Sequence, residues 1–261
     1  MAADRSGIEW TEATWNPTVG CTKVSPGCDR CYAERITQRF PATFPNGFTL
    51  TLRPDALDVP LRWKRPRLVF VNSMSDLFHV DVPESYLQLV FDVMARCPQH
   101  TFQILTKRAE RLARVAPRLR WPSNVWMGVS VESAQYKWRI DCLRRVPAAV
   151  RFLSAEPLLG SLAPLNLDGL DWVIAGGESQ AGARPARLTW FREIRSACRR
   201  ADVAFFLKQL GGHPSKRGGD DAVLNGRRYL EMPTPRRSSE QREAAIVATT
   251  RDLVPELQAS T

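Results

Sequence analysis

Short apolar runs alternate with amphipathic segments along most of the chain. The run 68–72 is apolar, rich in β-branched residues and flanked by polar ones, which predicts a strand buried on both faces. Pro83 begins a predicted helix that ends at Cys97, because apolar residues recur in it at helical spacing. The alternation continues, with strands predicted at 101–105, 125–129, 150–153, 172–175 and 204–207, and helices at 32–40, 108–119, 134–146 and 189–200.

Buried strands that alternate with helices pair in parallel through right-handed crossovers, so the pattern predicts the α/β class. With Thr14-Trp15 counted as the first strand, we expect a parallel, partial TIM-like barrel of about six to seven βα units. A doubly wound open sheet is the alternative. Residues 1–212 are expected to form the barrel, and residues 213–261 a C-terminal extension that is partly helical or disordered.

Composition narrows the class of protein. A hydrophobic fraction of 44% in 261 residues is that of a packed globular protein, and the apolar runs are too short to span a membrane. The N-terminus lacks a signal-peptide pattern, and six cysteines in a chain of this size fit a reducing compartment, so we expect a cytoplasmic protein without membrane contact. A net charge of +10 permits an anionic partner such as nucleic acid.

Three of the cysteines are crowded into one short loop: Cys21, Cys28 and Cys31. Pro26 and Gly27 force a turn that can bring the first thiol back toward the other two, which indicates a metal site. A closed zinc site needs four protein ligands, whereas three cysteines on an iron-sulfur cluster leave one iron free to bind a substrate. We therefore favour a cluster. The alternative is a structural zinc with a distant fourth ligand from one of the histidines, which are His79, His100 and His213.

Polar groups follow the C-terminal end of every predicted strand. In a parallel barrel these ends meet at one mouth, so the groups would converge on a single pocket with the metal loop, which is an active site by default. They are the segment from Asn72 to Asp76, Lys107 with Arg108, Ser130 with Glu132, Glu156, the triplet Gly176-Gly177-Glu178, and Lys208. The paired glycines would let the backbone approach a ligand closely. Motifs for nucleotide hydrolysis, dinucleotide binding and acyl transfer are absent from the sequence.

The three-cysteine loop at the start of a parallel barrel resembles that of the radical S-adenosylmethionine superfamily. More specifically, the chain resembles a phage-associated protein family of unknown function, found in phages and bacteria, over roughly residues 8–233. The segments that carry this resemblance are 14–33, 73–78, 105–108, 128–132, 154–158, 176–179, 205–209 and 225–233.

This resemblance implies a 4Fe-4S cluster on Cys21, Cys28 and Cys31, with S-adenosylmethionine bound to the open iron through its amino and carboxylate groups. An electron donor would reduce the cluster, and cleavage of the cofactor would give a 5′-deoxyadenosyl radical that abstracts hydrogen from an unknown substrate. Two features depart from the superfamily pattern. Six residues separate Cys21 from Cys28, and Arg30 stands where an aromatic residue is usual.

The resemblance also implies roles for the strand-end groups, with a nucleic acid or phosphorylated molecule as candidate substrate. They are Ser73, Ser75 or Asp76 for the cofactor's amino group, Lys107 and Arg108 for its carboxylate or an anionic substrate, Ser130 and Glu132 for its ribose, Gly176 and Gly177 for close backbone approach, and Glu156, Glu178 and Lys208 for the substrate side. The alternative function is a zinc-stabilised nucleic-acid-binding module without catalysis.

Overall fold

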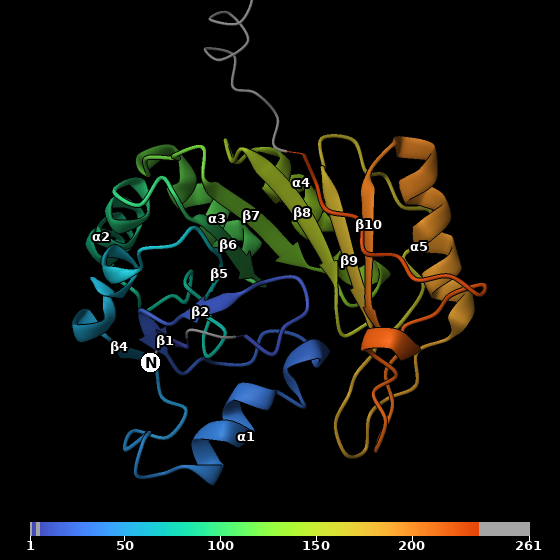
Figure 1. The fold of residues 1–261 in the computed structure, drawn as a ribbon, viewed down its shortest axis with the longest axis horizontal. Helices are drawn as coiled ribbons and strands as arrows, with labels where there is room; N and C mark the ends of the chain where they lie inside the picture. Colours follow the sequence, from blue (N-terminus) through green and yellow to red (C-terminus); the bar gives the residue numbers. More distant parts are fainter. Residues whose placement is uncertain (1, 4–5, 235–261) are drawn as a thin grey trace, which may run out of the picture.

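The computed structural model describes residues 2–3 and 6–234, which form one eight-stranded sheet flanked by helices (Figure 1). The strands, in sheet order, are β1 (Ala2–Ala3), β2 (Ala13–Trp15), β5 (Leu68–Val71), β6 (Thr101–Thr106), β7 (Val125–Ser130), β8 (Val150–Ala155), β9 (Trp172–Gly176) and β10 (Ala204–Gln209). The helices are α1 (Tyr32–Arg39), α2 (Glu84–Ala95), α3 (Ala109–Val115), α4 (Trp138–Arg144) and α5 (Leu188–Ala201). A separate antiparallel pair joins β3 (Thr18–Val19) to β4 (Thr51–Leu52).

Seven strands of the main sheet, from β2 to β10, run parallel in the order of the sequence, and only β1 is antiparallel. A doubly wound sheet would reverse its strand order at a switch point, so this order confirms the partial-barrel expectation. Buried residues of α2, α3, α4 and α5 pack with the strands in one large core cluster on one face of the sheet. No α-helix lies between β8 and β9.

The other face of the sheet is concave and has its own aromatic core. On β9, Val173 packs in the helix-side cluster, whereas Trp172 belongs to a second cluster, because successive strand residues point to opposite faces. Trp10 contacts Phe70 of β5 at a centroid distance of 4.9 Å and Trp172 of β9 at 6.0 Å. One indole reaches two strands that are separated by three others, so the sheet curves strongly around this cluster.

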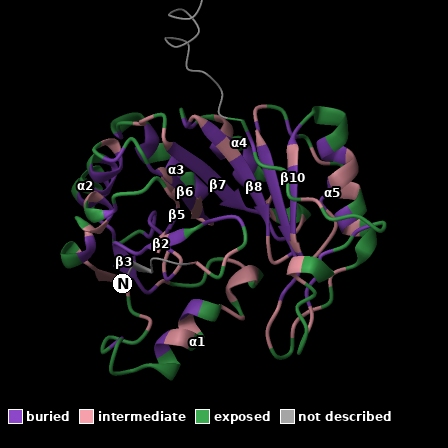
Figure 2. Ribbon diagram, in the orientation of Figure 1, coloured by how far each residue is buried: buried purple, intermediate pink, exposed green. Residues whose placement is uncertain are grey.

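Figure 2 shows that the sheet is buried along its length, while much of the surface of α1 and of the loops beside it is exposed. Residues 213–234 return along the β10 edge: Leu230 forms an antiparallel bridge to Phe206, and Leu224 is buried in the helix-side core. This segment covers an edge strand that would otherwise offer unpaired backbone groups. The domain division at residue 212 stays a prediction, and residues 235–261 lie outside the described part of the chain.

Two predicted helices are shorter than expected. The segment 108–119 is α-helical only to Val115 and continues as a 3₁₀ turn, because Pro117 has no N–H to donate to the helix. The segment 134–146 begins with a 3₁₀ turn, Ala134–Tyr136, before α4. Among the described helices, none combines the length and apolar character that a membrane crossing requires.

We predict that Trp172→Ala lowers the free energy of unfolding by about 3–5 kcal/mol, because it empties the centre of the inner aromatic cluster. Trp138→Ala is the control: that side chain is 41% exposed and the change should be less than about 1 kcal/mol. Urea unfolding followed by circular dichroism measures both. Equal effects of the two substitutions would contradict the assignment of an inner core.

Candidate functional site

Cys21, Cys28 and Cys31 line one cavity of about 160 Å³ at the carboxyl end of the sheet. All three are free and partly exposed. The cavity walls also include several of the residues predicted from the strand ends, namely Ser73, Ser75, Asp76, Lys107 and Ser130. Residues that are distant in sequence therefore converge on the cysteine loop (residues 20–31), as the parallel topology predicts.

The cysteine loop is held against a buried carboxylate. A Cβ atom on Gly27 would lie 2.4 Å from Oε1 of Glu132, so only glycine fits at this point of the Pro-Gly turn. Ser25 donates a hydrogen bond to the same oxygen at 2.6 Å, and Arg139 donates to Oε2 at 2.9 Å. Glu132 is fully buried, and both of its oxygens are paired within the chain. Glu132 therefore anchors the loop. This structural role explains the buried carboxylate, and contact with a ribose is not needed to explain it.

Asp76 organises the opposite wall of the cavity. One carboxylate oxygen accepts from the Thr106 hydroxyl at 2.7 Å, and the other accepts from the backbone N–H of Lys107 at 3.0 Å. Arg108 donates to the Thr22 hydroxyl at 2.7 Å and lies 3.8 Å from the Cys21 sulfur.

Burial, together with the negative charge of Asp76, raises the pKa of the Cys21 thiol to about 11, and Arg108 opposes this shift. At neutral pH the thiol is therefore protonated in the metal-free protein, and a metal ion has to displace this proton when it binds.

The histidines bear on the zinc alternative. His79 is buried beside the cysteine loop, but its Nε2 is hydrogen-bonded to the Thr22 hydroxyl at 2.9 Å, and its Nδ1 accepts from the backbone N–H of Asp81 at 3.2 Å. His100 is bonded to the Pro60 carbonyl at 3.2 Å. Within the described residues, no three His, Cys, Asp or Glu side chains are arranged as ligands of one metal ion.

An arginine-carboxylate cluster ties the β9–α5 connection to the cysteine loop. Glu178 is buried and accepts from Arg184 at 2.5 Å and from Arg30 at 3.2 Å. Arg30 lies inside the cysteine loop, and Arg184 also donates to the Pro26 carbonyl at 2.8 Å. Burial of Glu178 opposes its ionisation, but the hydrogen bonds from Arg184 and Arg30 outweigh burial and hold the pKa of its carboxyl below the usual range.

Glu156 and Lys208, both predicted for the substrate side, form an ion pair with each other at 2.5 Å. Gly176 and Gly177 lie beside them, where a Cβ would be 3.1 Å from the Glu156 carboxyl carbon and 2.3 Å from the Leu210 carbonyl oxygen, respectively. The close approach that these glycines allow is made by the protein itself. The two glycines are therefore explained by close packing against the residues that follow β8 and β10. The sequence suggested instead that a ligand approaches them.

Two predicted residues of the cavity have polar groups with few bonds to the described residues. The Ser130 hydroxyl is buried without a hydrogen-bond partner among the described residues, and the Lys107 ammonium has its nearest carboxylate, that of Glu132, at 3.9 Å. By contrast, the hydroxyls of Ser73 and Ser75 are bonded to the Asn16 side chain and to the Thr18 carbonyl. A buried hydroxyl without a partner costs free energy, so a bound polar ligand would stabilise this wall.

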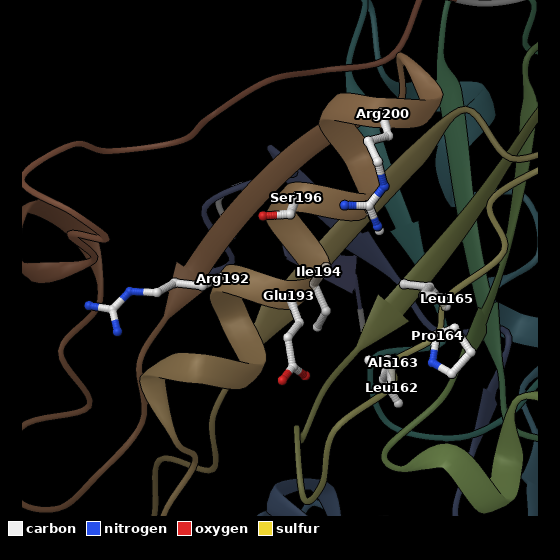
Figure 3. A pocket seen from close by; sticks show the side chains of 10 residues that line it. Leu162, Ala163, Pro164, Leu165, Arg192, Glu193, Ile194, Ser196 and Arg200 are labelled. Carbon is white, nitrogen blue, oxygen red and sulfur yellow. The ribbon is translucent and has the colours of Figure 1, made fainter.

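Another cavity, of about 310 Å³, lies between α5 and the segment after β8 (Figure 3). Glu193, Ile194 and Ser196 of α5 form one side, and Pro164 and Leu165 form the other. It contains none of the residues predicted for the site. Its walls come from α5 and from the connection between β8 and β9.

Sequence reasoning missed the residues that hold the loop in place. Arg139 and Arg184 follow no strand end. Ser25 reaches Glu132, and Arg184 reaches the Pro26 carbonyl, through contacts between distant parts of the chain. Arg184 lies in the irregular segment before α5, where the sequence carries no periodic signal. For Arg30 the sequence did carry a signal of an unusual role, since Arg30 occupies a position that is usually aromatic in the superfamily that the loop resembles.

The chain matches a family model, and its fold is similar to that of a solved structure. A family model, DUF5131, described as a protein of unknown function, matches residues 5–245. No curated protein matches the chain. Among solved structures, a spore photoproduct lyase mutant with bound AdoMet and dinucleoside spore photoproduct is similar, with a TM-score of 0.48 and 14% identity. The match covers 82% of this chain and 61% of that chain, and the two ligands are those of the lyase.

We predict that Glu178→Gln lowers the free energy of unfolding at pH 7 by about 2 kcal/mol, because it weakens charge-assisted hydrogen bonds at a buried site. The pKa of this carboxyl is lower in the folded protein than in the unfolded chain. Its contribution is therefore present above the ordinary carboxyl pKa and is lost as the pH falls below it.

Urea unfolding at pH 7 and in acid measures the effect of Glu178→Gln, and the difference from the unsubstituted protein should shrink in acid. Asp141→Asn is the control, since its exposed pair with Arg144 should contribute little. A loss that is independent of pH would contradict the assigned cause.

Proposed function

Since the chain belongs to DUF5131, a family of proteins of unknown function, its chemistry has to be inferred from the site, and we propose that it is a radical S-adenosylmethionine enzyme. Cys21, Cys28 and Cys31 would hold a 4Fe-4S cluster, and S-adenosylmethionine would bind next to it in the same cavity. When bound, the cluster supplies one electron to the cofactor's sulfonium. The substrate is unknown and is proposed to be anionic, with nucleic acid as a candidate.

The observation that carries this proposal is the composition of the cavity. Three free thiols from one loop share its walls with a buried hydroxyl, that of Ser130, which has no partner among the described residues. Thiolates are the ligands that iron-sulfur clusters use, and three of them leave one iron for an exogenous ligand. The bonds already made by both His79 nitrogens weigh against a zinc site completed by that side chain.

The chain's own residues would bind and orient the cofactor. Lys107 offers a cation to its carboxylate, and Ser130 offers a hydroxyl to its ribose or amino group. Asp76 fixes the backbone of Lys107 and therefore the direction of its side chain. Tyr32, which donates a hydrogen bond to the Ser73 carbonyl, joins α1 to the segment after β5 and narrows the entry of water to the cavity.

We predict that replacing Cys21, Cys28 and Cys31 together by Ala abolishes iron binding after anaerobic reconstitution. Cys142→Ala is the matched control, because Cys142 is buried in α4, outside the cavity, and this variant should keep its iron. Iron, sulfide and zinc analysis, with electron paramagnetic resonance of the reduced protein, measures both. Stoichiometric zinc without iron in the unsubstituted protein would contradict the proposal and favour a zinc-stabilised nucleic-acid-binding module.

We predict that Ser130→Ala weakens binding of S-adenosylmethionine about fivefold to tenfold, because one net hydrogen bond to the ligand is lost. The same substitution should not lower the free energy of unfolding, since the hydroxyl it removes is buried without a partner among the described residues.

Ser154→Ala is the matched control for Ser130→Ala. Ser154 pairs with Ser130 in the neighbouring strand and does not line the cavity, so its replacement should leave cofactor binding unchanged. Equilibrium binding to the reconstituted protein measures both variants. Equal weakening by the two would show that Ser130 acts only through the packing of the sheet.

A further inference from the structure

A cavity of about 310 Å³, separate from the one of the same size beside α5, adjoins the cysteine cavity. We call it the arginine cavity. It is lined by the β6–α3 connection, by α3, by the start of α4 and by the rim residue Val80. Val24 and Lys107 line both cavities, so the two share a wall. A ligand in the arginine cavity would therefore lie next to the cysteine cavity.

The arginine cavity is strongly cationic. Among its described lining residues, Glu110 is the one carboxylate, while the segment around it supplies Lys107, Arg108, Arg111 and Arg114. Arg111 donates to the carbonyls of His79 and Val82, which hold its charge in place, and no described carboxylate forms an ion pair with it. Arg114 is exposed and forms no ion pair with another described residue. Burial, and then the charge of Arg114, hold the pKa of Arg111 below its usual range.

The rim of the arginine cavity carries exposed apolar surface. Trp138, the first residue of α4, is 41% exposed, and Val24 and Val80 are 39% and 64% exposed. Exposed indoles beside cations are typical of surfaces that bind single-stranded nucleic acid, where phosphates meet the cations and bases stack on the rings. A neutral or basic ligand would gain nothing from the uncompensated arginines.

We propose that the arginine cavity binds a single strand of nucleic acid, with phosphates on Arg111 and Arg114 and a base stacked on Trp138. The strand would lead past Lys107 into the cysteine cavity. This inference rests on the proposed function, because it assigns binding of the proposed enzyme's substrate to the arginine cavity. The net charge of +10 favours a polyanion, which contacts many cations at once, over a free nucleotide.

The test is the binding of a labelled oligothymidylate or oligouridylate of about ten nucleotides to the full chain, followed by fluorescence anisotropy between about 50 and 200 mM salt. Arg114→Gln should weaken binding about fivefold and reduce the slope of log Kd against log salt by about 0.7, the share of one phosphate contact on a single strand. Trp138→Ala should weaken binding about tenfold through the loss of stacking.

Arg199→Gln is the matched control. It removes the same charge from an exposed position on α5, and binding should be unchanged. An equal loss in Arg199→Gln would show diffuse attraction and overturn the proposal. So would the absence of binding at low salt, tighter binding of a duplex of the same sequence, or displacement of the strand by an equal concentration of mononucleotide.

The binding measurement needs neither reduction nor cofactor cleavage, so it separates this inference from the proposed function. A protein that binds the strand as described but holds zinc contradicts the proposed function alone. A protein that loads iron and cleaves S-adenosylmethionine without binding the strand contradicts the arginine cavity alone.

Discussion

The arrangement of the site depends on one contact, in which the Pro-Gly turn of the cysteine loop lies against the buried carboxylate of Glu132. Gly27 has no side chain to keep the two apart, and Ser25 and Arg139 occupy both carboxylate oxygens. A buried charge is tolerated only when it is paired in this way. Glu132 lies just after β7, so the end of this strand fixes the loop that carries the cysteines, and the curvature of the sheet fixes where the strand ends.

The two faces of the sheet are packed differently, and only one of them contributes described residues to the floor of the cysteine cavity. The helix side is one large core of aliphatic and aromatic side chains, whereas the concave side has a smaller cluster built mainly of aromatic rings around Trp172. Phe70 belongs to this inner cluster and also lines the cysteine cavity, so the inner core forms the floor of the site. In parallel barrels the site that binds a ligand lies at the carboxyl ends of the strands, and the cysteine cavity lies at this end.

Electrostatic pairing decides which predicted groups remain for a ligand. Glu132, Glu156 and Glu178 each have a cationic partner inside the chain, and these pairs fasten loops together. Among the described residues around the two adjoining cavities, what is left is the unpartnered Ser130 hydroxyl, two arginines without a carboxylate partner, Arg111 and Arg114, and Lys107, whose nearest carboxylate is 3.9 Å away. The charge of the ligand-facing surface is thus more positive than the residue types at the strand ends suggest, which is why an anionic substrate is the proposal that fits.

The sequence by itself determined the alternation of strands and helices, the convergence of strand ends and the cysteine loop, because these follow from local periodicity and from the geometry of parallel sheets. It also identified several residues that line the cavity, such as Lys107 and Ser130, at the ends of β6 and β7. Only the tertiary structure decided what those groups contact. Arg184 reaches the Pro26 carbonyl of the cysteine loop from an irregular segment, and Gly177 makes room for the Leu210 carbonyl. Side-chain pairing of this kind depends on distances across the fold, which no local pattern encodes.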